Sequence, residues 1–380
     1  MGKYLDEAFC EGTYEKFDID NFTYNETIMK LRTDDMEMPI LSMLVTRAKE
    51  GGEELLVTGD GEGRIRVWET ETWKQLVQFA GHRCGVTTMI VAETGQIISG
   101  GADNDIWSWN LLSFKGEKLI AGVPPIAMNA FMDLKTALTV TWNGHDASIF
   151  SLGLVNATRE GVEEAGGGDR KFEWKGSLVR TKEEVEGDGG FFRALVSGDF
   201  HGKIMVWDTR VKPPELVAEL DDHAGPVRVL EAQEEKNLLF SAGEDWAINV
   251  WRTDTFKLVR RLMGHGAPVR CLRRVGELLL SGSMDCSLRG WNLLAGGQPV
   301  DLALNHTGWV MNMHVDEARE RIITGCSDGG VYVWDLSSHA LLSETPTHDG
   351  WVLALAMVTG GRVVSSSSEL DLAIRPLELC

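Results

Sequence analysis

The chain has 380 residues, of which 43% are hydrophobic, enough to bury a large core and too many for a mainly disordered protein. Its 37 Lys and Arg against 57 Asp and Glu give a net charge of −20, which disfavours direct binding to the phosphate backbone of nucleic acids. The six cysteines form no Cys-x-x-Cys pair and have no metal-ligand spacing, so we expect no metal, no cofactor and a reducing compartment.

The sequence carries no pattern for export or for crossing a membrane. Its first residues lack the apolar run of a signal peptide, and no stretch of 18 uncharged apolar residues predicts a membrane span. We therefore expect a cytoplasmic or nuclear protein.

Taken in chain order, the first expected features are a tail and a short strand. Residues 1–26 are expected to form an N-terminal tail or a strap across the outside. Residues 27–32 (TIMKLR) resemble the short apolar strand pattern at 258–262 (LVRRL). From residue 27 to residue 380 such patterns follow one another, and this range is the expected folded domain.

Within that range, six similar segments each begin with Ser or Thr and a small residue and end with Trp ten positions later. They are TGDGEGRIRVW (58–68), SGGADNDIWSW (99–109), SGDFHGKIMVW (197–207), SAGEDWAINVW (241–251), SGSMDCSLRGW (281–291) and TGCSDGGVYVW (324–334). Except for one longer interval, the closing tryptophans lie about 40 to 44 residues apart. Each segment is a strand, a tight Gly/Asp turn and a second strand, with a further apolar run on either side. Four strands per period indicate one blade of a propeller, and such blades stack in a ring because one alone cannot bury both faces.

Two further features make the pattern resemble the WD-repeat β-propeller family. A Gly-His or similar pair precedes the innermost strand at Gly81-His82, Asp222-His223, Gly264-His265, Asn305-His306 and Thr347-His348. The Trp-Asp dipeptide occurs at Trp207-Asp208 and Trp334-Asp335. The resemblance covers roughly residues 27–380 and implies an all-β fold, a single propeller of four-stranded antiparallel blades.

The number of blades depends on two degraded copies, residues 138–152 and residues 363–377, where Arg375 stands in the place of the Trp. Six strong copies and these two predict eight blades, with seven as the alternative. Between the third and fourth copies, an acidic, Gly-rich insertion at about 160–190 is expected, in which residues 172–181 would be the first strand of the fourth blade. The chain ends after the third strand of its last blade, so we expect residues 27–32 to supply the missing outer strand and close the ring.

Histidine, hydroxyl, aspartate and tryptophan recur together in this pattern. The sets are His82/Ser99/Asp103/Trp109, His223/Ser241/Asp245/Trp251, His265/Ser281/Asp285/Trp291 and His306/Thr324/Asp328/Trp334. A hydrolase needs one exposed nucleophile with its base, and four copies argue against that. The family resemblance implies a buried structural hydrogen-bond chain in each blade, so we expect no catalytic residues. His145, His201, His314 and His339 lie outside the repeated position and are expected to be ordinary surface or strand histidines.

A protein-binding surface is expected where the turns leading into the innermost strands share one face with the turns between second and third strands. Aromatic residues gather at these positions, namely Trp246, Trp309, Trp351, Phe200 and His201, and exposed aromatics of this kind form binding hot spots. The alternative is that the tryptophans fold inward between blades. The leading hypothesis is a non-enzymatic scaffold, monomeric within a larger complex of other proteins, with partners that include basic segments.

A second functional hypothesis rests on one box. Trp207-Asp208-Thr209-Arg210 resembles the Trp-Asp-x-Arg box of WD-repeat substrate receptors for cullin-4-type ubiquitin ligases. By that resemblance, Trp207, Asp208 and Arg210 would contact the ligase adaptor, with Arg210 supplying a fork-shaped, charge-assisted contact.

Overall fold

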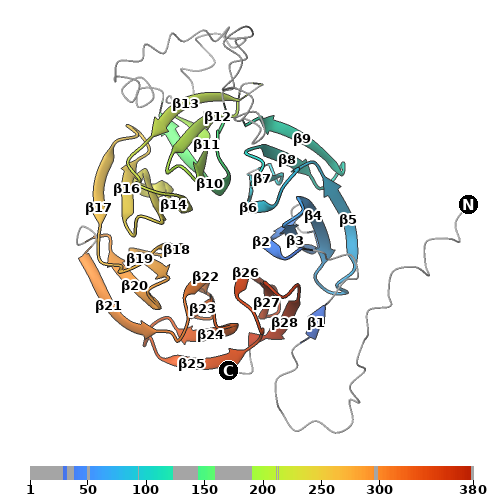
Figure 1. The fold of residues 1–380 in the computed structure, drawn as a ribbon, viewed down its shortest axis with the longest axis vertical. Coiled ribbons are helices and arrows are strands. Elements are labelled where there is room, and N and C mark those ends of the chain that lie inside the picture. Colours follow the sequence, from blue (N-terminus) through green and yellow to red (C-terminus); the bar gives the residue numbers. More distant parts are fainter. Residues whose placement is uncertain are drawn as a thin grey trace, which may run out of the picture.

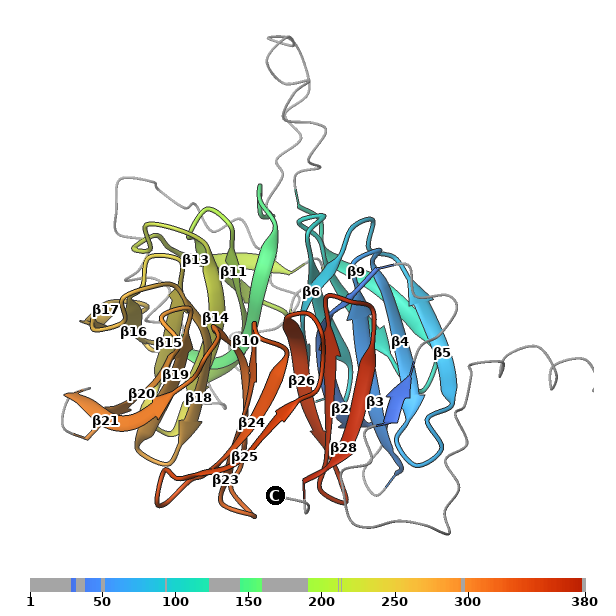
Figure 2. The ribbon, with the colours of Figure 1, turned by 60° about the horizontal axis from the view of Figure 1, so that its bottom comes forward.

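The computed structural model describes residues 29–31, 38–48, 52–92, 94–122, 144–158, 191–210, 212, 214–294 and 298–377. In this part of the chain, seven four-stranded antiparallel sheets stand around a central axis as the blades of a propeller (Figure 1). Seen from another angle, the strands run between the two faces of a disc (Figure 2).

The blades follow one another along the chain. Blade 1 contains β2 (Ile40–Arg47), β3 (Glu54–Asp60), β4 (Arg64–Glu69) and β5 (Gln75–Ala80), and blade 2 contains β6 (Val86–Val91), β7 (Ile97–Gly101), β8 (Ile106–Asn110) and β9 (Lys115–Ile120). Blade 3 contains β10 (Ile149–Thr158), β11 (Phe191–Asp199), β12 (Ile204–Asp208) and β13 (Glu215–Leu220), and blade 4 contains β14 (Val227–Gln233), β15 (Leu238–Gly243), β16 (Ile248–Arg252) and β17 (Leu258–Leu262), with a 3₁₀ turn at Glu234–Lys236. Blade 5 contains β18 (Val269–Val275), β19 (Leu278–Ser283), β20 (Ser287–Asn292) and β21 (Gln298–Asn305), and blade 6 contains β22 (Val310–Asp316), β23 (Arg321–Cys326), β24 (Gly330–Asp335) and β25 (Leu341–Pro346). Blade 7 contains β26 (Val352–Val358), β27 (Arg362–Ser367), β28 (Leu372–Pro376) and β1 (Met29–Leu31).

The core lies between blades rather than within one of them. The second strand β15 is almost wholly buried, whereas the outer strand β17 exposes four of its five residues. Leu262 at the end of β17 packs in one cluster with Leu279 and Trp291 of the next blade. A blade flanked on both faces therefore needs continuous apolar runs in its inner strands, which is the pattern the sequence shows.

The innermost strand of every blade has the same irregularity. Its pairing with the second strand shifts just after its first residue, as between Ile40 and Ser42 in blade 1 and between Val352 and Ala354 in blade 7. A bulge of this kind leaves one residue out of the ladder and re-aims its side chain. The residues so released lie at the end of the disc where the chain enters the innermost strands.

The prediction of eight blades was wrong: the described residues form seven. The supposed third copy, residues 138–152, overlaps the start of β10 (Ile149–Thr158), which is the first strand of the same blade as segment 197–207, because β10 pairs with β11 from Ile149↔Asp199 to Thr158↔Phe191. That strand position was assigned to residues 172–181, which lie outside the described residues. The long connection between β10 and β11 breaks the period, so one blade was counted as two.

The first and last strands of the propeller lie side by side (Figure 1). Met29, Lys30 and Leu31 of β1 pair antiparallel with Ile374, Ala373 and Leu372 of β28. Blade 7 also contacts blade 1 directly, since the hydroxyl of Ser366 donates a hydrogen bond of 3.0 Å to the carbonyl of Ile40. How much the N-terminal strand contributes to ring closure stays a prediction.

Two expected segments, residues 1–26 and the insertion at about 160–190, lie outside the described residues. Among the described helical segments, none has the length and apolar character to cross a membrane.

Candidate protein-binding face

A hydrogen-bond chain runs through the centre of each of several blades. In blade 2, His82 Nδ1 lies 2.9 Å from Asp103 Oδ1, His82 Nε2 lies 2.7 Å from Ser99 Oγ, and Trp109 Nε1 donates to the same Oγ at 2.8 Å. The sets of His223 and His265 repeat this geometry. Ser99, Ser241 and Ser281 are wholly buried, so their hydroxyls are closed to any substrate.

Blade 3 contains a set that the sequence reasoning missed. His145 Nδ1 lies 2.8 Å from Asp199 Oδ2 and its Nε2 lies 2.6 Å from Ser197 Oγ, which also accepts from Trp207 Nε1. His145 is wholly buried. The expectation of an ordinary histidine outside the repeat was therefore wrong, because the miscounted blade hid its partners.

Blade 7 has its own version of the chain. His348 Nδ1 contacts Asp371 Oδ1 at 2.8 Å, and its Nε2 contacts Ser365 Oγ at 2.8 Å. Arg375 replaces the Trp and donates to the carbonyl of Val331 in blade 6 at 3.2 Å.

Blade 6 departs from the predicted set. His306 Nε2 lies 2.8 Å from Thr324 Oγ1, but the buried Nδ1 atom of His306 has no hydrogen-bond partner. Asp328 instead accepts hydrogen bonds from the hydroxyls of Thr307 and Tyr332. Tyr332 and Thr307 take the carboxylate in place of the histidine, so the predicted His306–Asp328 contact was wrong.

Burial sets the ionisation of these groups. Burial lowers the pKa of His265, and it lowers the pKa of His306 to about 4. Burial raises the pKa of Asp103, but hydrogen bonds from His82 and from the backbone outweigh it, so the pKa of Asp103 is lowered overall. Except in blade 6, the histidine, the hydroxyl and the aspartate of each set satisfy one another's hydrogen-bonding groups, which stabilises the fold.

The top face of the propeller is defined by the turns that precede the innermost strands and the turns between second and third strands. In all seven blades, a backbone N–H of the latter turn donates to the carbonyl that precedes the innermost strand. These bonds are Gly61 to Pro39, Ala102 to Gly85, Phe200 to Ser148, Glu244 to Pro226, Met284 to Pro268, Ser327 to Trp309 and Ser368 to Trp351, all 2.9 to 3.0 Å long. The two kinds of turn therefore share one face, as the sequence predicts.

Two tryptophans of neighbouring blades meet on this face. The rings of Trp309 and Trp351 lie edge to face, with centroids 5.4 Å apart and an angle of 63°. Trp351 is 47% exposed and Trp309 is partly buried against it. Each backbone N–H is held by a serine hydroxyl of the facing turn, Ser327 at 2.9 Å and Ser368 at 3.1 Å. The pair is thus fixed by main-chain contacts, and its side chains lie on the surface.

A second aromatic group lies over blades 3 and 4. Phe200 is 50% exposed, and its ring lies 6.1 Å from that of Phe150 and 5.9 Å from that of His201. Arg228, the bulge residue of β14, places its guanidinium 4.1 Å from the centre of the Phe150 ring and donates to Glu244 at 2.8 Å. Phe150 and Arg228 were missed by the sequence analysis. Their shared signal is the position just after the first residue of each innermost strand.

Trp246 is the third exposed aromatic of this face. It is 47% exposed and has a positive φ of 67° in the turn between β15 and β16. Positive φ is uncommon for a bulky residue, and here the N–H of Trp246 donates to the carbonyl of Gly243 to close the tight turn. The side chain is left outside the core.

Acidic side chains lie beside the Trp309–Trp351 pair. A Cβ added to Gly308, next to Trp309, would lie 3.0 Å from the carboxylate carbon Cγ of Asp328, and one added to Gly350, next to Trp351, would lie 2.9 Å from the Cγ methylene of Glu369. Aromatic faces and carboxylates both attract cations, so the local chemistry favours a positively charged side chain.

The Trp-Asp-x-Arg box lies away from this face and is largely engaged within the protein. Trp207 is wholly buried, so it cannot contact an adaptor and that expectation was wrong. Arg210 donates hydrogen bonds from Nε and Nη2 to the carboxylate of Asp208, the latter at 2.7 Å. Its guanidinium lies 4.2 Å from the centre of the Phe192 ring. Arg210 remains the one residue of the box with a substantially exposed side chain, 45%.

Comparisons with known proteins agree with the repeat pattern. The family model "WD domain, G-beta repeat" matches residues 73–110, 256–292 and 298–335. The chain is 30% identical over 134 residues to the DENN domain and WD repeat-containing protein SCD1 of Arabidopsis thaliana (35% of this chain, 11% of that protein). It is 27% identical over 167 residues to the nuclear distribution protein nudF of Aspergillus niger (42% and 37%), and 29% identical over 181 residues to WD repeat-containing protein 55 of Pongo abelii (46% and 47%). The chain thus spans less than half the length of each of these relatives.

One solved structure supports the architecture. A crystal structure of the computationally designed Ika8 protein matches with a TM-score of 0.57 and 19% identity, covering 90% of this chain and 96% of the designed one. At that identity the likeness is evidence for the fold alone.

Proposed function

Because this chain is a WD-repeat β-propeller, we propose that it is a non-enzymatic scaffold that binds other proteins through its top face and assembles them into a complex. The observation that carries the proposal is the Trp309–Trp351 pair, an edge-to-face aromatic surface built on fixed backbone. Rigid, exposed aromatics lose little conformational entropy on binding, which is why they dominate protein interfaces.

The partner we propose presents basic side chains. Asp328 and Glu369 flank the tryptophan pair, and the whole chain carries a charge of −20. A lysine or arginine placed over Trp351 would meet both an aromatic face and a carboxylate, and the overall charge would speed its approach at low salt. In that complex the propeller itself would be a monomer in the cytoplasm or the nucleus.

The test is a double variant, Trp309→Ala with Trp351→Ala, compared with the wild type in affinity purification and mass spectrometry. We expect partners to be lost while the circular dichroism spectrum and the melting temperature stay nearly unchanged, since the backbone contacts of both turns remain. A matched control is Leu112→Ala with Phe114→Ala, two exposed residues in the turn between β8 and β9, at the opposite ends of the strands. If the tryptophan variant unfolds, or if it retains every partner, the top-face assignment is wrong.

The ubiquitin-ligase role is a second proposal and rests on Arg210 alone, whose side chain is 45% exposed. Recovery of a cullin adaptor with the wild type but not with Arg210→Ala would support it. Recovery of a stable complex without ligase components would favour the scaffold.

A further inference from the structure

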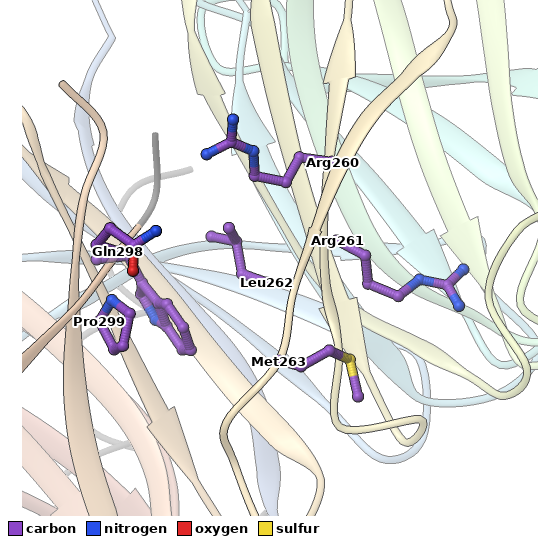
Figure 3. Close-up of a pocket in the computed structure, with 7 residues that line it drawn as sticks. Arg260, Arg261, Leu262, Met263, Gln298 and Pro299 are labelled. Atoms are coloured by element: carbon purple, nitrogen blue, oxygen red, sulfur yellow. The ribbon is translucent and has the colours of Figure 1, made fainter. Parts of the chain in front are cut away.

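A hollow of about 390 Å³ lies on the side of the disc, between the outer strands of blades 4 and 5. It is lined by Arg260, Arg261, Leu262, Met263, Trp291, Gln298 and Pro299. Figure 3 shows Arg260 and Leu262 projecting from β17 toward the side where Gln298 and Pro299 lie, whereas Arg261 points away. This site is distinct from the top face, because it is formed by outer strands and not by the turns at their ends.

The floor of the hollow is apolar. Leu262 and Trp291 are both buried in the cluster between these blades, while Met263 beside them is 59% exposed. Pro299 covers the opposite wall and has no backbone N–H to offer. An occupant that places an apolar side chain against this floor would shield Met263 and Leu262 from water.

The rim of the hollow is cationic and uncompensated. Within the described residues, the exposed Arg260 guanidinium has no ion pair or hydrogen bond. Arg289 of blade 5 lies near the hollow without lining it: a Cβ added to Gly264, the residue after Met263, would lie 3.2 Å from the Trp291 ring and 3.6 Å from Arg289 Nη1. The one hydrogen bond described for Arg289 is a long one of 3.4 Å to Ser287.

Comparison with the other blades shows that the positive charge of Arg260 is particular to blade 4. Arg260 pairs with Val250 in the ladder, and the residues at the same register in blades 1, 3, 5 and 6 are Val77, Ala218, Val300 and Ser343. Blade 2 places Glu117 there, so none of these five blades has a positive charge at this position. On a chain with a net charge of −20, an exposed arginine without an ion pair among the described residues, beside an apolar hollow, is the reverse of the general surface.

We propose that this hollow binds an acidic segment of a partner polypeptide that carries an apolar residue between its carboxylates. A carboxylate matches the fork of donors on Arg260 and Arg289, the amide of Gln298 offers a further donor, and the apolar residue fills the floor over Trp291. The volume of the hollow is in the range of sites that hold a few side chains. The outer edge of β17 pairs with no other strand among the described residues, so an extended peptide has room to lie along it.

The experiment uses the full chain and fluorescence polarisation of two labelled peptides, one with four glutamates around a central leucine and one with lysines in place of the glutamates. We expect the glutamate peptide to bind and Arg260→Glu to weaken that binding about ten- to hundredfold, since a charge-assisted contact is replaced by repulsion. The matched control is Lys115→Glu, the same change of charge at an exposed residue of the outer strand of blade 2. It should leave the affinity unchanged, as should the Trp309→Ala, Trp351→Ala variant.

Three results would overturn the proposal. Equal weakening by Lys115→Glu would show that only the total charge matters. Equal binding of the lysine peptide would remove the role of the arginines. Displacement of the glutamate peptide by an equal concentration of inorganic phosphate would make the hollow a general anion site. Because Arg260 is exposed, Arg260→Glu should fold normally, and Arg260→Ala gives a second, milder variant that should lower the affinity in the same direction.

Discussion

The buried chain through His265 makes a quantitative prediction about stability. Ser281 Oγ accepts a hydrogen bond from Trp291 Nε1 at 2.8 Å, so its own proton points to His265 Nε2, 2.7 Å away. The remaining proton of the neutral imidazole is then on Nδ1 and is donated to Asp285 at 2.8 Å. His265→Ala breaks both contacts and leaves the buried Ser281 hydroxyl without an acceptor.

The magnitude follows from these contacts. A neutral hydrogen bond contributes about 0.5–1.5 kcal/mol and one to a charged group about 1.5–3 kcal/mol, so the free energy of unfolding should fall by about 2–4 kcal/mol. Asp285 keeps the hydrogen bonds from Ser287 and from the N–H of Gly266, which makes the lower half of that range the better expectation. Urea unfolding at unchanged m-value measures the loss, and His201→Ala, at an exposed histidine, serves as the control.

A double-mutant cycle tests the geometry itself. His265 and Asp285 should show a coupling energy of about 1 kcal/mol or more, whereas His306 and Asp328 should be additive within about 0.5 kcal/mol, because His306 Nδ1 has no partner. Equal coupling in the two blades would refute the assignment of these hydrogen bonds. So would a fully stable His265→Ala protein that had lost a measurable catalytic activity.

Three further outcomes are expected. Deletion of residues 1–35 removes β1 from the edge of β28 and should cause aggregation or a large drop in melting temperature; an unchanged melting temperature would show that the N-terminal strand does not close the ring. His145→Ala should destabilise the protein as His265→Ala does, and a change within about 0.5 kcal/mol would contradict its placement in the blade 3 set. Burial lowers the pKa of His306 to about 4, so the unfolded chain takes up a proton near pH 6.5 before the folded one does. From this group, stability present above pH 6.5 should be lost, by up to about 3 kcal/mol, as the pH falls from 6.5 to 4. His306→Asn should make the melting temperature depend less on pH over that range, and the remaining dependence should come from His314, whose pKa burial also lowers to about 4.

The regular part of the propeller was predictable because each blade packs between two neighbouring blades and therefore needs the same buried residues at the same positions. A closing Trp at a fixed distance from a Ser or Thr reflects one hydrogen bond, as in Trp251 to Ser241, so its recurrence in the sequence marks a blade. The period fails where the chain between two paired strands is long. β10 and β11 are neighbours in the sheet but far apart in the sequence, and no local pattern indicates that they belong together.

The candidate binding face was predictable only at its turns. Trp309 and Trp351 directly precede innermost strands, and Gly and Pro at the same position in other blades reveal a turn. Phe150 and Arg228 are the bulge residues of β10 and β14, directly after the first residue of each strand. A bulge leaves no mark on the alternation of apolar and polar residues in the sequence. In blade 7 the acid that contacts His348 is Asp371, six positions after Ser365, whereas Asp103 lies four positions after Ser99, and only the folded backbone shows this difference.

Repetition within one chain also indicates where function lies. The buried positions carry nearly the same residues from blade to blade, because Ser99, Ser241 and Ser281 all hold a Trp and a His in one geometry. The residue before the innermost strand faces no such demand, since its structural role is a backbone hydrogen bond that any side chain permits. Gly85, Pro226 and Trp351 all fulfil that role. The choice of tryptophan at two adjacent blades is therefore not required by the fold, and the same reasoning applies to Arg260, where blades 1, 3 and 6 place small or apolar residues and blade 2 places a residue of opposite charge. In a ring of equivalent blades, the positions at which a blade differs without a structural reason are the positions to mutate first.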